Sequence, residues 1–246
     1  KRLLGGGHHS IEAPYILYDE STECYYLYVS YGELTRDGGY QIRVFKSDKV
    51  DGDYVDMNGA APDSTSSHDY YGLKLSGNYY LPGLEVGYKA TGHNSAFIDE
   101  DGKKYVVYHT RFDKASEKHT PKAKQYFTNK EGWPCLLPYT TSQETISDTG
   151  YSKDEMVGRY YVINQGIGIN SEVAEPVILY LDKNGTIEGE EVKGSWSFEE
   201  GSYYMNILVD EKEYSGIFCK MLDEAGIEVM TFSAVGNNES LWGVKY

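Results

Sequence analysis

The sequence has little of what marks several large classes of protein. No apolar run approaches the roughly 20 residues that a membrane-spanning helix needs, so we expect no membrane partner. Basic residues are scarce: 23 Lys and Arg stand against 38 Asp and Glu, giving a net charge of −15, and no basic stripe offers a surface to nucleic acid. An acidic surface suits a protein that acts on a neutral substrate.

Motifs for metal, phosphate and serine chemistry are also missing. The three cysteines, Cys24, Cys135 and Cys219, are far apart and odd in number, which predicts neither a disulfide framework nor a zinc motif. The run Gly5-Gly6-Gly7 is not followed by a helix start or a P-loop lysine, so we interpret it as a turn. The serines lack a nucleophile-elbow context, which argues against a serine hydrolase.

What the 246 residues do contain is a period of two. Short runs rich in Tyr, Val and Ile are bounded by Gly, Asp and Asn, the pattern of an all-β fold. Asp99-Glu100-Asp101-Gly102 predicts a hairpin turn, and no amphipathic helix is evident before about residue 153. The strands predicted in the first half span residues 13–18, 25–31, 40–47, 96–98, 104–110 and 124–128.

A weak repeat relates two segments about 80 residues apart, EAPYILYDESTECYYLYVSYG and HNSAFIDEDGKKYVVYHTRF. Each contains a polar start, an apolar strand, an acidic turn and a second strand rich in Tyr or Val. Such repeats suggest propeller blades, here with insertions such as residues 56–71. The alignment places His93 opposite Glu12, so both would lie on inner strands facing a central channel.

The composition changes near residues 138–152, which are rich in Thr, Ser, Gln, Asp and Gly. We therefore predict a first domain over residues 1–140, a linker over 141–155 and a second domain over 156–246. The second domain is expected to be a small antiparallel barrel or sandwich without obvious chemistry. Its predicted strands span residues 158–164, 176–182, 193–198, 203–209, 213–221, 228–235 and 241–244.

Two residues are candidates for chemistry, each with an ordinary structural alternative. Glu12 begins an apolar strand between Ile11 and Ala13, a setting that suits a general acid, although a strand-edge glutamate is often simply paired or solvated. His93 in TGHNSAF is a candidate ligand or substrate contact, although a lone histidine is more often structural. Tyr31 and His9 are candidates for substrate contact, the former by stacking on sugar faces.

Several motifs together resemble a known family: HSIEAPYILYD, RVFKSDKVDGDY, YYGLKLSGNYYL, TGHNSAFIDEDGKKYVVYHTRF and NKEGWPCLLPY, in that order. They are similar to the later part of the catalytic domain of family 43 glycoside hydrolases of the arabinanase type. Residues 156–246, with MTFSAVGNNESLWG, resemble the lipocalin-like barrel that follows it. The resemblance implies the last blades of a five-bladed propeller followed by a small antiparallel barrel.

The resemblance also implies an activity: inverting hydrolysis of the α-1,5-linkages of arabinan or arabino-oligosaccharides by a secreted or periplasmic enzyme. The Glu of IEAPY is the family's general acid, which carries over to Glu12. The His of GHNS binds a metal, usually calcium, which carries over to His93. The family's general base and its pKa-tuning Asp precede these motifs, so we expect them, with the remaining blades, in an N-terminal fragment of the same enzyme.

Two other functions stay open on the sequence alone. The chain could be a non-catalytic carbohydrate-binding module whose tyrosines stack on sugars. It could also belong to a family 43 β-xylosidase or α-L-arabinofuranosidase, and endo and exo action are not distinguished.

Overall fold

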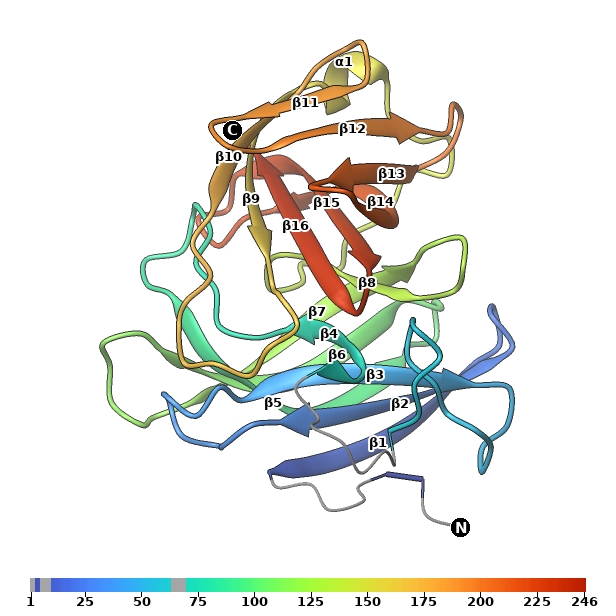
Figure 1. Cartoon of the computed structure of the whole chain (residues 1–246), viewed down its shortest axis with the longest axis vertical. Helices are drawn as coiled ribbons and strands as arrows, with labels where there is room; N and C mark the ends of the chain where they lie inside the picture. Colours follow the sequence, from blue (N-terminus) through green and yellow to red (C-terminus); the bar gives the residue numbers. More distant parts are fainter. Residues whose placement is uncertain (1–2, 5–9, 63–69) are drawn as a thin grey trace.

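The computed structural model describes residues 3–4, 10–62 and 70–246. Within these ranges the chain forms two four-stranded antiparallel sheets and one closed barrel of eight strands (Figure 1). The single turn α1 (Lys153–Met156) is the only α-helix in this part of the chain, and no helix there is long and apolar enough to cross a membrane. The predicted all-β fold ending in an antiparallel barrel is confirmed.

The first two sheets are meanders in which each strand pairs with the next along the chain, as in propeller blades. The strands of the first sheet are β1 (Ile11–Asp19), β2 (Cys24–Tyr31), β3 (Gln41–Ser47) and β4 (Leu73–Ser76). The strands of the second are β5 (Tyr88–Ile98), β6 (Lys104–Phe112), β7 (Thr120–Thr128) and β8 (Pro134–Leu136). Strand β1 packs beside β5, so the first strands of the two sheets are neighbours.

The turn between β5 and β6 shows how acidic and glycine residues punctuate the strands. Asp99 Oδ1 accepts hydrogen bonds from the backbone N–H groups of Asp101 and Lys103 at 3.0 and 2.8 Å. Gly102 has a φ of +78°, which glycine adopts without the clash of a Cβ. The predicted hairpin is present, although β5 begins earlier than the predicted 96–98.

Strands β1 and β5 are interrupted at equivalent points. The pairing of β1 with β2 shifts register between Glu12 and Tyr15, and that of β5 with β6 shifts between Gly92 and Ser95, an offset of 80 residues in both cases. The predicted repeat therefore exists in the backbone. Its register differs by one residue from the predicted one, because Glu12 corresponds to Gly92 and not to His93.

The barrel closes when its last strand pairs with its first. Its strands are β9 (Gly158–Asn164), β10 (Val177–Leu181), β11 (Thr186–Gly189), β12 (Lys193–Phe198), β13 (Tyr204–Val209), β14 (Lys212–Leu222), β15 (Glu228–Gly236) and β16 (Glu239–Lys245). Ser152 caps α1 just before the barrel: Ser152 and Glu155 form a reciprocal capping box.

The barrel packs directly on the two sheets, and one apolar core continues through the contact. Trp242 of β16 is fully buried, and its ring meets that of Tyr79 edge-on at 5.0 Å. The β9–β10 loop (residues 165–176) descends from the barrel onto the first sheet (Figure 1). There the Nζ of Lys74 donates a hydrogen bond to the carbonyl of Gly168 at 2.9 Å, and the guanidinium of Arg43 donates to that of Ile167. Buried basic side chains of the sheet thus hold a barrel loop in place.

Candidate functional site

Glu12 lies at the bulge near the start of β1, on the strand that packs beside β5. The adjoining Ser10 and Ala13 have φ values of +57° and +50°, so the backbone around Glu12 departs from regular strand geometry. Non-glycine residues with positive φ are uncommon and often mark functional sites. The Glu12 side chain is 45% exposed, which leaves it open to a substrate.

Tyr40, at the end of the β2–β3 loop, fixes the carboxyl group of Glu12. Its hydroxyl donates a hydrogen bond to Glu12 Oε1 at 2.7 Å, while the residue as a whole is fully buried. Burial and, second, the bond to Glu12 raise the pKa of the Tyr40 phenol far above its usual range. The phenol therefore stays protonated and acts as a donor.

His93 lies against the same hydroxyl. Its Nδ1 is 3.4 Å from Tyr40 Oη and 4.0 Å from Glu12 Oε1, and its side chain is 57% exposed. The structure thus brings together the two residues that the sequence singled out for chemistry. Their roles as acid and metal ligand stay predictions.

A buried chain of hydrogen bonds ties the two bulges together. The backbone N–H of His93 donates to Ser30 Oγ at 2.8 Å, and Ser30 Oγ donates to Asn94 Oδ1 at 2.8 Å. The Nδ2 of Asn94 then donates to the carbonyl of Ala13 at 3.2 Å. Because Ser30 and Asn94 are buried, these bonds are shielded from water and hold β5 in register with β1 beside Glu12.

Two further histidines extend the cluster. The ring of His109 stacks on that of Tyr40 and on that of His93, with centroids 5.9 Å apart in both pairs, and lies 4.7 Å from the ring of His119. Burial and, next, the neighbouring His119 lower the pKa of His109 to about 4. His109 is therefore neutral near pH 7 and serves as an aromatic wall.

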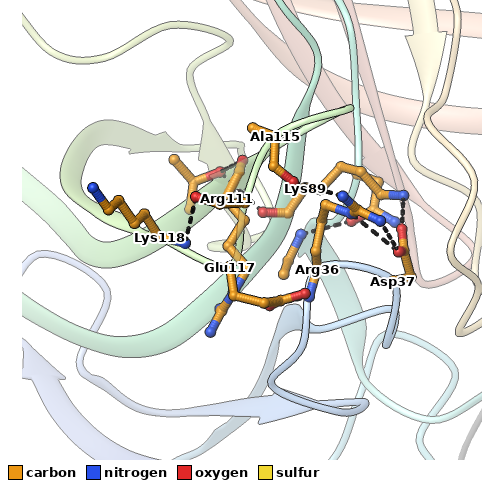
Figure 2. A network of polar contacts seen from close by, with 11 residues as sticks. Arg36, Asp37, Lys89, Arg111, Ala115, Glu117 and Lys118 are labelled. Carbon is orange, nitrogen blue, oxygen red and sulfur yellow. Dashed lines mark hydrogen bonds and ion pairs between the residues drawn. The ribbon is translucent and has the colours of Figure 1, made fainter.

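Ion pairs and hydrogen bonds of charged side chains connect the loops around the cluster, as Figure 2 shows. In the loop before Tyr40, Asp37 pairs with the buried Lys89 of β5, and the Nη1 of Arg36 donates to the carbonyl of Ala115 at 2.6 Å. Glu117 Oε2 accepts from the backbone N–H of Arg36 at 3.0 Å and from the Nε of Arg111 in β6 at 2.9 Å. The β2–β3 and β6–β7 loops are thereby joined to the strands that carry the cluster.

Not every predicted site residue lies in this cluster. Tyr31 is fully buried against Val29, Phe45 and Tyr54, so its ring has no face for a sugar, and the predicted stacking role is wrong for this structure. Its place in a strand whose last six residues are all buried explains the error. His9 lies outside the described residues.

The described residues do not by themselves form a metal site. They contain no group of three or more His, Cys, Asp or Glu side chains placed to hold an ion, and calcium prefers several oxygen ligands. The exposed imidazole of His93 could supply one contact, and the calcium prediction stays untested.

Sequence reasoning missed Tyr40, and it set His109 and His119 aside because they lack ligand spacing. In the structure His109 pairs across the ladder with Gly92, the residue before His93, and this pairing has no local signal in the sequence. Tyr40 gave none either, because its approach to Glu12 depends on how a loop folds back over two strands.

The all-β chain, with its two meanders and closed barrel, is similar to proteins of glycoside hydrolase family 43. Residues 138–243 match that family's C-terminal lipocalin-like domain. All of this chain aligns with the extracellular endo-α-(1→5)-L-arabinanase 2 of Bacillus subtilis (strain 168), with 38% identity over 261 residues and 55% of that protein covered. The extracellular endo-α-(1→5)-L-arabinanase of Thermotoga petrophila is 36% identical, again with all of this chain and 55% of that protein covered.

Solved structures agree in fold. A crystal structure of endo-1,5-α-L-arabinanase from Thermotoga petrophila superimposes with a TM-score of 0.94 at 35% identity, over 100% of this chain and 57% of that one. A family 43 glycoside hydrolase from Bacillus licheniformis gives 0.92 at 37% identity, over the same shares. The chain spans about half the length of the curated relatives it matches.

Proposed function

We propose that this chain is part of a secreted glycoside hydrolase that cleaves the α-1,5-L-arabinofuranosidic linkages of arabinan, and that it supplies the general acid. The names of its relatives support the substrate and the extracellular location. The net charge of −15 also suits a neutral polymer over an anionic one.

The proposed step at this site is proton donation. As the bond from the anomeric carbon to the glycosidic oxygen breaks, its electron pair passes to the oxygen, which takes the proton of Glu12. A water molecule attacks the anomeric carbon from the opposite face, so the configuration inverts. The base that activates this water is proposed to belong to the part of the relatives' length that this chain does not span.

The observation that carries the proposal is the placement of Glu12. Its carboxyl group is partly open to solvent, is held at Oε1 by a buried tyrosine, and lies 4.0 Å from His93 at neighbouring backbone bulges. A glutamate with only a structural role has no need of an open second oxygen.

Glu12→Gln tests the acid directly. In the arabinan-degrading protein that contains this chain, we expect turnover of linear arabinan to fall about 10²- to 10⁴-fold, because the amide has no proton to give. Stability should change little, since the side chain is partly exposed. Glu100→Gln, on the exposed β5–β6 turn, is the matched control.

Turnover of Glu12→Gln equal to that of the control would remove Glu12 from the mechanism. Binding of arabino-oligosaccharide without any hydrolysis by the wild type would favour a carbohydrate-binding module. NMR of the first product formed tests inversion at the anomeric carbon, and comparison of arabinan with xylan tests the substrate.

A further inference from the structure

Tyr40 is fully buried, and its neighbours constrain its ring. Its ring lies so close to Gly92 that a Cβ there would meet the Cδ1 and Cε1 atoms at 2.4 Å, and the ring stacks on that of His109 at 5.9 Å with 21° between the planes. Behind it, Gly39 adopts a φ of +70° and lies against Asn170 of the β9–β10 loop. A side chain this constrained presents its hydroxyl at a fixed point.

At that point the Tyr40 hydroxyl meets one oxygen of the Glu12 carboxyl group. The Tyr40 hydroxyl donates to Oε1 at 2.7 Å, whereas Oε2 has no hydrogen bond among the residues that the structure describes. The occupied oxygen serves as an acceptor, so the transferable proton of the protonated carboxyl resides on Oε2. Glu12 is therefore restrained in rotation, with its donor oxygen free.

We propose that Tyr40 is a positioning residue for Glu12: its buried hydroxyl anchors Oε1 so that Oε2–H points at the glycosidic oxygen. The proposal rests on the proposed function of Glu12 as general acid. When Oε2 gives up its proton, the carboxyl group becomes negative. The hydrogen bond from the Tyr40 hydroxyl to Oε1 remains and becomes charge-assisted. The same contact thus orients the acid and stabilises the carboxylate that proton transfer leaves behind.

The surroundings favour this role over simple packing. The loop that delivers Tyr40 is fixed by the Asp37–Lys89 ion pair and by the bonds of Arg36 to Ala115 and Glu117 (Figure 2). These charged anchors hold the loop at the distance needed for the bond from Tyr40 to Glu12. A ring needed only for burial would not require its polar end to meet a partly exposed carboxyl group.

The test is Tyr40→Phe, which removes the hydroxyl and keeps the ring that lies against Gly92 and His109. It is made in the arabinan-degrading protein that contains this chain. On linear arabinan, whose leaving group is a sugar hydroxyl that needs a proton, we expect kcat to fall about 10- to 100-fold. On an arabino-oligosaccharide with a 2,4-dinitrophenyl leaving group, which departs without a proton, kcat should stay within about twofold of wild type.

Tyr160→Phe is the matched control. Tyr160 is also fully buried, and its hydroxyl donates to the carbonyl of Met156 at 2.7 Å inside the barrel, so the same atom is lost away from Glu12. We expect it to leave kcat on both substrates unchanged.

Each outcome decides the proposal. An arabinan-selective loss in Tyr40→Phe supports it. Equal losses of kcat on the two substrates show a merely structural role and overturn the proposal. A Tyr40→Phe variant that hydrolyses arabinan at the wild-type rate also overturns it. If Glu12→Gln hydrolyses arabinan normally, or the wild type does not hydrolyse it, the proposed function fails as well; if only Tyr40→Phe is silent, the function stands and the positioning role alone falls.

Discussion

At the scale of single residues, His109 couples the stability of the cluster to pH. Its folded-state pKa of about 4 lies below the value of 6.5 that it has when unfolded, chiefly through burial and the nearby His119. Between these values the unfolded chain binds the proton that the folded chain rejects, so this contribution to stability is complete above pH 6.5 and is lost as the pH falls toward 4.

His109→Phe should therefore flatten this part of the stability profile, because it keeps an aromatic ring beside Tyr40 but cannot titrate. Urea unfolding of the wild type and the variant at several pH values between 7 and 4 measures the effect. The wild type should lose more stability than the variant over this range. Parallel profiles would show that His109 does not carry the proton linkage.

The residues of the site differ in how far the sequence could reveal them. Glu12 and His93 lie in strands whose repeat is visible in the sequence, so their proximity could be predicted, although one residue out of register. Tyr40 and His109 join them through a loop closure and a cross-strand pairing, neither of which leaves a local pattern. The predicted stacking role of Tyr31 was wrong because a strand buried on both faces has no alternation of polar and apolar residues to show which side chains are exposed.

At the scale of elements, the bulge in β5 makes room for Tyr40. A Cβ on Gly92 would lie 2.4 Å from the Tyr40 Cδ1 and Cε1 atoms, and the ring has His109 stacked against it. We expect Gly92→Ala to cost about 1–3 kcal/mol of stability through overpacking, and to lower arabinan turnover by displacing the Tyr40 hydroxyl. Thermal and urea unfolding measure the first effect, and kinetics the second.

A second substitution separates crowding from other causes. The double variant Gly92→Ala/Tyr40→Leu should recover stability relative to the sum of the single changes, without recovering turnover. Gly168→Ala is the control, because its Cβ would meet only Asn170 Nδ2, at 4.0 Å. Strict additivity of the two substitutions would contradict the proposed contact.

Among whole strands, the sequence predicted the longer ones and missed those of three or four residues. The observed β9 and β12 begin and end where they were predicted. Strands β4 and β8 were missed because each has three or four residues, all buried, and so no period of two. Strand β11 was missed because TIEG is short and mostly polar. Pairing with longer neighbours, and not local propensity, determines these segments.

At the scale of the whole molecule, buried basic side chains join the barrel to the sheets, which could not be predicted from the sequence because lysines and arginines rarely lie in a core. Arg43 and Lys74 are both buried, and both donate to carbonyl groups of the β9–β10 loop. This loop packs against Gly39, the residue before Tyr40. The barrel therefore contacts the backbone that positions Tyr40, the residue that binds the proposed acid Glu12.

Lys74 gives this junction a pH dependence that can be measured. Burial and, second, the nearby Arg43 lower its pKa from 10.5 to about 7. Between pH 7 and 10.5 the unfolded chain holds a proton that the folded chain has released. Stability due to this group therefore rises with pH, by at most about 1.4 kcal/mol per pH unit. Lys74→Met removes the titration, so the stability of this variant relative to wild type should be highest near pH 7 and should fall steadily toward pH 10.

Urea unfolding at intervals across this range measures the difference in stability, with Lys183→Met, at an exposed position, as the control. A difference between Lys74→Met and wild type that does not change with pH would mean that Lys74 keeps its proton in the folded protein, and that the β9–β10 loop is held by an ammonium group and not by a neutral amine.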